Sequence, residues 1–234
     1  MSRDRTSLLA LSGAALSAAL LVTGCSMTDG PTKKAERTYT VQGKVTVIDA
    51  QTLGGDISVR PLAEGADKVQ VTERYEYSGP KPNPEHRLAN GRFVVKKAHC
   101  GDSHRCTVHL TVLAPPAVAV ELKTAGGDIT VAGTSGGVDA DTSGGDIRVE
   151  DSASRSVRAV TRGGNVTAAF TAAPDAVDGR TQGGDITVRV PKGSYAVDAT
   201  TSGGDRKVTV PSTAGAPHRI KVLSHGGDVS VLSS

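Results

Sequence analysis

Apolar and polar residues alternate with a period of two through most of the chain after about residue 41. This period is typical of β-strands that bury one face, because successive side chains point to opposite sides of a sheet. No window beyond the first 24 residues shows the 3.6-residue period of a capped amphipathic helix. The pattern therefore predicts an all-β fold.

A pair of glycines followed by an acidic or amide residue interrupts this alternation seven times. From Gly126 onward the interruptions are 18, 19, 20, 20 and 23 residues apart, which indicates a repeat of about 19 residues. The seven corners are Gly54-Gly55-Asp56, Gly126-Gly127-Asp128, Gly144-Gly145-Asp146, Gly163-Gly164-Asn165, Gly183-Gly184-Asp185, Gly203-Gly204-Asp205 and Gly226-Gly227-Asp228.

Residues at fixed distances from the corners are also alike. Six positions before the first glycine stand the β-branched apolar residues Ile48, Val120, Val138, Val157, Val177, Val197 and Ile220. Two positions before it stand the hydroxyl residues Thr52, Thr124, Thr142, Thr161, Thr181, Thr201 and Ser224. Directly after the acidic or amide position, six repeats have Ile57, Ile129, Ile147, Val166, Ile186 and Val229. The repeat therefore includes a strand on each side of the corner.

One such unit of strand, corner, strand and return loop cannot bury its apolar face alone. We therefore expect successive units, here called coils, to stack about 4.8 Å apart around a narrow core. The prediction is a parallel, β-helix-like solenoid over residues 39–234. We expect the glycines to supply a positive φ at each corner, and Asp or Asn to accept hydrogen bonds from the turn's own amides. The structural alternative is an antiparallel sandwich, which gives no reason for one corner to recur at one offset.

Two places depart from the repeat. Arg206 stands where the other coils have Ile or Val, so we expect a distorted coil or a shift by two residues, with Val208 and Val210 buried. About 72 residues separate the first corner from the second, which is far more than one coil. We expect the segment at about 69–116 to form an N-terminal cap, in which residues 93–97 and 107–113 make a hairpin with residues 100–106 at its tip.

The first 24 residues are typical of an export signal. Arg3 and Arg5 precede a 15-residue apolar stretch, residues 8–22, which is too short for a membrane-spanning helix of about 20 residues. The following Leu21-Val22-Thr23-Gly24-Cys25 resembles the lipobox of bacterial lipoproteins, whose cysteine receives a diacylglycerol. We expect removal of residues 1–24, lipidation of Cys25 and a flexible tether at 25–38, with the protein anchored outside the cell membrane. The alternative is an ordinary signal peptide that ends near a cysteine.

Cysteine usage favours the same compartment. The chain has three cysteines, and lipidation of Cys25 leaves Cys100 and Cys106, which are plausible disulfide partners in an oxidising exterior. The alternative is a zinc or copper site, because His99, His104 and His109 lie in the same segment. The spacing is not that of a usual zinc knuckle, so the disulfide is the preferred interpretation.

Charge and composition limit the possible functions. Without residues 1–24 the chain has 25 Lys and Arg against 23 Asp and Glu, a net charge of +2, which gives no electrostatic case for nucleic acid. Trp is absent and aromatic residues make up 3% of the chain, which argues against stacking sites for sugars. If there is a binding hot spot, we expect it at Tyr75, Tyr77, Phe93, His99 and His104.

Three functions are compatible with these features. The first is a non-catalytic surface scaffold that binds an envelope polymer or a protein through its regularly spaced groups. The second is an enzyme acting on polysaccharides, in which Asp128, Asp146, Asp185 and Asp205 would lie about 5 Å apart. The third is a solenoid stabilised by calcium, although the corners lack the GGxGxD form of the calcium repeat. We prefer the first and expect no catalytic residue, metal or cofactor.

The repeated hydroxyl residue, Gly-Gly-Asp-Ile and second alternating strand resemble the "putative adhesin" family of bacterial β-strand-repeat proteins. The resemblance covers roughly residues 41–232 and is clearest at 120–210. It implies a right-handed, parallel β-helix-like solenoid outside the cytoplasmic membrane, with adhesion or envelope-stress sensing as the expected role. It provides no catalytic motif.

Overall fold

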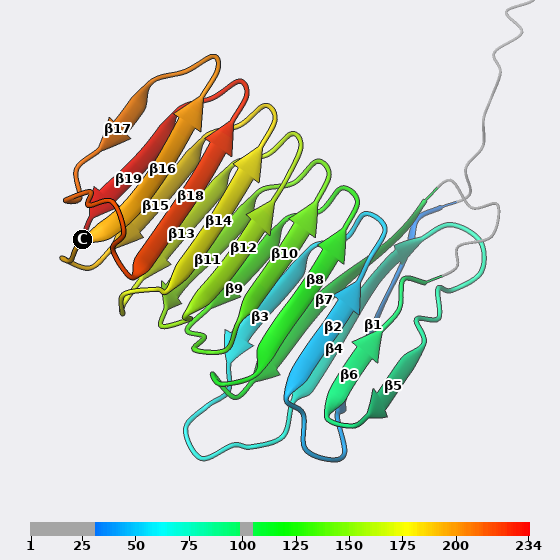
Figure 1. Ribbon diagram of the computed structural model, residues 1–234. Coiled ribbons are helices and arrows are strands. Elements are labelled where there is room, and N and C mark those ends of the chain that lie inside the picture. Colours follow the sequence, from blue (N-terminus) through cyan, green and yellow to red (C-terminus); the bar gives the residue numbers. More distant parts are fainter. Residues whose placement is uncertain (1–30, 99–104) are drawn as a thin grey trace, which may run out of the picture.

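The computed structural model describes residues 31–98 and 105–234, which form two long sheets facing each other (Figure 1). Every described element is a β-strand. Most neighbouring strands within each sheet are parallel, and the chain crosses from one sheet to the other at the glycine corners. The expected β-helix-like solenoid is confirmed.

The first sheet has ten strands. In spatial order they are β1 (Lys33–Thr40), β4 (Gln70–Tyr77), β7 (Cys106–Ala114), β3 (Ile57–Pro61), β9 (Ile129–Ala132), β11 (Ile147–Ser152), β13 (Val166–Phe170), β15 (Ile186–Val190), β19 (Val229–Ser233) and β17 (Arg206–Val208).

The second sheet has nine strands. In spatial order they are β16 (Tyr195–Thr201), β18 (His218–Ser224), β14 (Ala176–Thr181), β12 (Ser156–Val160), β10 (Val138–Thr142), β8 (Ala119–Thr124), β2 (Val47–Gln51), β6 (Arg92–Val95) and β5 (His86–Ala89).

The core is a set of columns in which equivalent residues of neighbouring coils lie one above another. Val138 pairs with Val120 on one side and with Val157 on the other, and Ile147 pairs in the same way with Ile129 and Val166. These side chains are at most 4% exposed. Because each buried Val or Ile contributes roughly 1.5 to 3 kcal/mol, the columns hold neighbouring coils together.

The hydroxyl column joins the coils through hydrogen bonds. Thr142 Oγ1 donates to the carbonyl oxygen of Gly127 in the neighbouring coil at 2.9 Å, and it accepts from the amide of Gly145 in its own coil at 3.3 Å. Thr124, Thr161, Thr181, Thr201 and Ser224 make the equivalent pair of bonds. A hydroxyl oxygen can both donate and accept, which explains its presence in these six repeats. Thr52, in the first repeat, instead donates to Gly55 O within its own corner at 2.7 Å.

The corner glycines are needed for close approach of the backbone and not for a positive φ, so that part of the sequence prediction was wrong. Among the described residues, none of the glycines with positive φ belongs to a corner. Instead, a Cβ added to the second corner glycine would overlap the backbone of the neighbouring coil. At Gly145, for example, the added Cβ would lie 2.0 Å from the carbonyl oxygen of Gly127. The first glycine of the same corner, Gly144, has nothing nearer than 3.8 Å.

The acidic column also differs from the prediction. Each corner carboxylate except that of Asp205, in the terminal coil, accepts a hydrogen bond from the next coil and not from its own turn. For example, Asp146 N donates to Asp128 Oδ1, and Asn165 N donates to Asp146 Oδ1, both at 2.8 Å. Asn165 continues the column by accepting from Asp185 N at 2.8 Å. An amide oxygen can therefore replace a carboxylate oxygen in this column.

The spatial order of the coils is not their order in the sequence. Strands β18 and β19, the last in the chain, lie between the β14–β15 coil and the β16–β17 coil, and Figure 1 shows β18 between β14 and β16. Arg206 therefore belongs to the terminal coil. It stays in register opposite Val229, so the expected shift of two residues does not occur. Its side chain is exposed and donates from Nε to Ala199 O at 2.8 Å, while Val210 is buried as expected.

The N-terminal insertion caps the other end of the stack, but not through the hairpin that we predicted. Strands β6 and β7 belong to opposite sheets and pair in parallel with β2 and β3, so they form a further coil without a Gly-Gly-Asp corner. The cap consists of β1 and β4, which continue the ten-stranded sheet antiparallel, and of the β5–β6 hairpin in the other sheet. Residues 33–38, which we expected in the tether, lie in β1.

Candidate functional site

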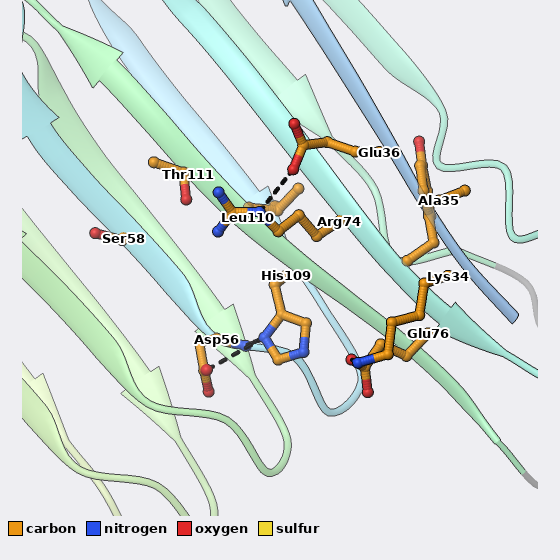
Figure 2. A pocket seen from close by; sticks show the side chains of 11 residues that line it. Lys34, Ala35, Glu36, Asp56, Ser58, Arg74, Glu76, His109, Leu110 and Thr111 are labelled. Carbon is orange, nitrogen blue, oxygen red and sulfur yellow. Dashed lines mark hydrogen bonds and ion pairs between the residues drawn. The ribbon is translucent and has the colours of Figure 1, made fainter. Parts of the chain in front are cut away.

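A groove of about 680 Å³ lies on the outer face of the ten-stranded sheet, near the cap (Figure 2). Strands β1, β4, β7 and β3 form its floor. Its polar lining residues are Lys34, Glu36, Asp56, Ser58, Arg74, Glu76, His109 and Thr111. They point outward because their strand neighbours, such as Tyr75 and Leu110, are buried in the core.

Two ion pairs cross the groove between β1 and β4. Lys34 Nζ lies 2.7 Å from Glu76 Oε1, and Arg74 Nε lies 2.7 Å from Glu36 Oε2. The antiparallel register places Lys34 opposite Glu76 and Glu36 opposite Arg74. The hydrogen bond from Lys34 holds the pKa of the Glu76 carboxyl below its usual value. Exposed pairs of this kind contribute only about 0 to 1 kcal/mol, so a partner could displace either of them at little cost.

His109 occupies the first position of the acidic column. Its Nδ1 lies 3.1 Å from Asp56 N and 3.2 Å from Asp56 Oδ2 (Figure 2). Nδ1 accepts from the Asp56 amide, as Asp56 Oδ1 accepts from the Asp128 amide one position along the stack. His109 therefore ends the column that the corner aspartates form.

The Oγ of Ser58 is buried and has no hydrogen bond among the described residues. Ser58, His109 and Asp56 are residue types of a catalytic triad, but a triad requires the serine hydroxyl to bond the imidazole, and Ser58 makes no such bond. The groove thus offers charged groups for binding.

A buried carboxylate lies under the cap, between the two sheets. Glu73 is fully buried and accepts hydrogen bonds from Tyr39 at 2.9 Å and from Tyr75. His86 Nε2, from β5 in the opposite sheet, lies 2.6 Å from Glu73 Oε1. The Tyr39 ring packs against His86 with centroids 4.8 Å apart. These contacts satisfy a charge that would otherwise be costly to bury, and they join β1, β4 and β5.

Burial raises the pKa of both phenols of this cluster well above the ordinary value of a tyrosine, and the Glu73 carboxylate raises it further. Both phenols therefore stay protonated at neutral pH and can donate to Glu73. The cluster therefore links the two sheets at the N-terminal end of the stack.

The corner carboxylates do not form an uninterrupted acidic row. Asn165 separates Asp146 from Asp185, and Asp228 lies between Asp185 and Asp205. Of the four aspartates considered for catalysis, Asp128 and Asp146 are therefore the two that are neighbours in the column. Arg148 binds their other oxygens, at 3.2 Å from Asp128 Oδ2 and 2.5 Å from Asp146 Oδ2. The spacing that we considered for a glycosidase therefore holds at most for neighbouring members of the column.

The expected aromatic hot spot is not exposed. Tyr75 and Phe93 are 2% and 3% exposed and belong to the core, and Tyr77 is half-buried. His99 and His104 lie outside the described residues. The prediction was wrong for Tyr75 and Phe93 because both follow the inward half of the strand alternation.

Cys25 and Cys100 also lie outside the described residues. Cys106 is the first residue of β7. Lipidation of Cys25 and the Cys100–Cys106 disulfide therefore stay predictions.

Within residues 31–98 and 105–234, no three His, Cys, Asp or Glu side chains are arranged to hold a metal ion. The same part of the chain has no helix that is long and apolar enough to span a membrane.

The sequence prediction missed the groove and the Glu73 cluster. A signal for the groove exists, since Lys34-x-Glu36 and Arg74-x-Glu76 place opposite charges face to face once two strands pair antiparallel. His109-Leu110-Thr111-Val112 also matches Asp56-Ile57-Ser58-Val59 in its apolar positions. The Glu73 cluster had no such signal, because its residues come from three strands whose pairing the repeat does not specify.

A family model described as Toastrack DUF4097 matches residues 38–232. Among solved structures, the chain resembles a "putative cell adhesion protein" from Clostridium sporogenes, with 12% identity, a TM-score of 0.50 and coverage of 86% of this chain and 100% of the other. It also resembles a "putative adhesin" from Bacteroides fragilis, with 15% identity, a TM-score of 0.49 and coverage of 86% and 97%. No curated protein sequence matches the chain. The Clostridium likeness supports the fold.

Proposed function

The chain belongs to the Toastrack DUF4097 family, and on that premise we propose that it is a non-catalytic, lipid-anchored protein of the cell envelope that binds a partner through its outer surface. The same binding surface would serve adhesion or envelope sensing. Support for a role in adhesion comes from the structural relatives named as adhesins. Support for the anchor comes from the lipobox-like sequence that ends at Cys25.

The observation that carries the proposal is the groove of Figure 2. It offers two cations, three carboxylates and an imidazole on a floor of four hydrogen-bonded strands. A rigid floor lowers the entropic cost of binding, and weak exposed ion pairs can be exchanged for a partner's charges. The partner that fits is a polar envelope polymer or a protein segment that carries both charge signs.

Binding is tested by sedimentation of the protein with purified cell walls of the source organism. We expect the wild type to sediment with the walls, and the double variant Arg74→Ala with His109→Ala to bind at least about ten-fold more weakly. Arg158→Ala is the matched control, because Arg158 also pairs with a carboxylate, Asp139, but lies on the other sheet. No binding by the wild type, or an equal loss in the control, would contradict the groove as the site.

The anchor is tested separately by labelling growing cells with radioactive palmitate. We expect label in the wild type and none in Cys25→Ala. We further propose the Cys100–Cys106 disulfide, which predicts that these two cysteines react with iodoacetamide only after reduction. Reaction of the unreduced protein at both positions would contradict it.

A further inference from the structure

Charge is distributed unevenly along the stack. Residues 31–114, which include the cap and its first two coils, contain 13 Lys and Arg against 9 Asp and Glu, a net charge of +4. Residues 115–234, which form the remaining coils, contain 12 against 13, a net charge of −1. The excess of positive charge therefore lies at the N-terminal end of the solenoid.

Four exposed cations surround that end. Lys33 and Arg37 come from the edge strand β1, Arg87 comes from the edge strand β5, and Lys81 lies in the connection between β4 and β5. Among the described residues none of the four forms an ion pair with a carboxylate. Arg37 and Lys81 instead lie over the rings of Tyr39 and Tyr75, at 5.0 and 4.5 Å from their centroids. Their charges are available to an external anion.

The position of Cys25 sets how far this end can be from a membrane. Eight peptide units separate Cys25 from Lys33, and an extended chain spans at most about 3.6 Å per residue, so Lys33 lies within about 29 Å of the anchored cysteine. The ten strands from β1 to β17 extend over about 43 Å at the usual strand spacing. The basic end is thus the part of the described chain that a lipid on Cys25 would bring nearest to the bilayer.

We infer that the N-terminal end, defined by Lys33, Arg37, Lys81 and Arg87, docks on an anionic lipid surface. This inference rests on the proposed lipid anchor, which alone would hold the chain at a membrane without setting its orientation. Docking of the basic end would orient the stack away from the bilayer, with the terminal coil β16–β17 outermost. The net charge of −1 on the later coils disfavours the alternative in which the stack lies flat.

The test is sedimentation of the mature chain, residues 25–234, carrying Cys25→Ser, so that no lipid contributes. The vesicles are pure phosphatidylcholine or phosphatidylcholine with phosphatidylglycerol. We expect binding only to the vesicles with phosphatidylglycerol, and loss of binding as salt rises, because salt screens contacts between exposed charges. Lys33→Gln with Lys81→Gln and Arg87→Gln should weaken binding at least about ten-fold, since each basic residue near an anionic surface contributes about a factor of five.

The matched control is Lys192→Gln with Lys207→Gln and Lys221→Gln, which removes three exposed cations from the other end of the stack. We expect binding like that of wild type, with circular dichroism showing that both triple variants remain folded. Equal binding to both kinds of vesicle, or equal loss in the two triple variants, would overturn the inference. Palmitate labelling reports on the anchor independently: labelled protein with no vesicle binding rejects the docking surface, and vesicle binding without label rejects the anchor.

Discussion

At the scale of single residues, the two glycines of a corner have different tasks. The second glycine permits contact between neighbouring backbones, since a Cβ at Gly127, Gly145 or Gly164 would lie 2.0 to 2.3 Å from a carbonyl oxygen of the adjacent coil. The first glycine has more space: a Cβ would meet nothing within 4 Å at Gly54 and nothing nearer than 3.8 Å at Gly144, although at Gly203 and Gly226 the nearest atom lies at 3.2 Å. The hydroxyl and acidic columns then join the same backbones by hydrogen bonds. Stacking thus depends on one glycine, one hydroxyl and one acceptor in each coil.

Substitution of the two glycines of one corner should therefore have unequal effects. Gly145→Ala should lower the free energy of unfolding by at least about 3 kcal/mol, because the backbones of two coils must separate to admit the methyl group. Gly144→Ala is the matched control and should change it by less than about 1 kcal/mol. Urea denaturation followed by circular dichroism measures both. Equal losses of stability would show that the glycines are required for their backbone conformation and not for close contact between neighbouring coils.

The tyrosines that bond Glu73 predict a loss of stability at high pH. Their pKa is raised in the folded protein by burial and by Glu73, so above about pH 10, where unfolded tyrosines ionise, deprotonation favours the unfolded state. Stability should be unaffected by these groups below that pH and should fall as pH rises through the folded pKa values. Thermal melts from pH 8 to about 11 should show this fall, and a weaker one in Tyr39→Phe with Tyr75→Phe.

Tyr77→Phe is the control for that series, because the Tyr77 hydroxyl does not bond Glu73. It should keep the pH dependence of wild type. A double variant with an unchanged slope would show that the cluster does not govern alkaline unfolding.

At the scale of the strand and the coil, the sequence specifies what each coil looks like but not which coil lies beside which. The columns of Val138 and Ile147 were predictable, because a period of two and a fixed corner determine the inward face. The position of β18–β19 was not, since every coil presents the same column residues to either neighbour. The β6–β7 coil was missed because it lacks the corner motif, although His109 takes the acidic position there.

The candidate site was predictable to a smaller extent for the same reason. Glu36 and Arg74 face each other only after β1 has paired with β4, and the repeat contains no information about that pairing. The corner aspartates were identified correctly as structural, but their partner is the next coil. Their role follows from stacking, which only the assembled coils display.

The acidic column also predicts how the protein responds to calcium. One oxygen of every corner carboxylate except that of Asp205 already accepts a backbone N–H. Arg148 also binds the second oxygens of Asp128 and Asp146. A calcium site requires six to eight oxygens, so millimolar calcium should change the melting temperature by less than about 1 °C. Magnesium is the control. A rise of several degrees with calcium alone, abolished by Asp185→Asn with Asp228→Asn, would establish the calcium-stabilised solenoid instead.

At the scale of the whole molecule, the solenoid has two unlike ends. The N-terminal end is closed by the cap, where the contact between Glu73 and His86 links the two sheets. Exposed cations surround this end. The other end is the β16–β17 coil, where β17 has three residues and Arg206 and Lys207 are exposed. A short edge strand with positive charge resists pairing with a further strand, so the stack ends there. One end is thus suited to an anchor and the other to solvent.

The most direct test of the parallel stack and of the order of its coils is the distance between spin labels on the nine-stranded sheet, measured by pulsed electron paramagnetic resonance. Labels at Glu121 and Lys221 are four strands apart, and labels at Glu121 and Asp198 are five strands apart. We predict backbone separations of about 19 and 24 Å, so that Lys221 is nearer than Asp198 although it follows later in the sequence. A shorter distance to Asp198 would contradict the position of β18 between β14 and β16, and distances that do not rise in steps of about 5 Å would contradict the parallel stack.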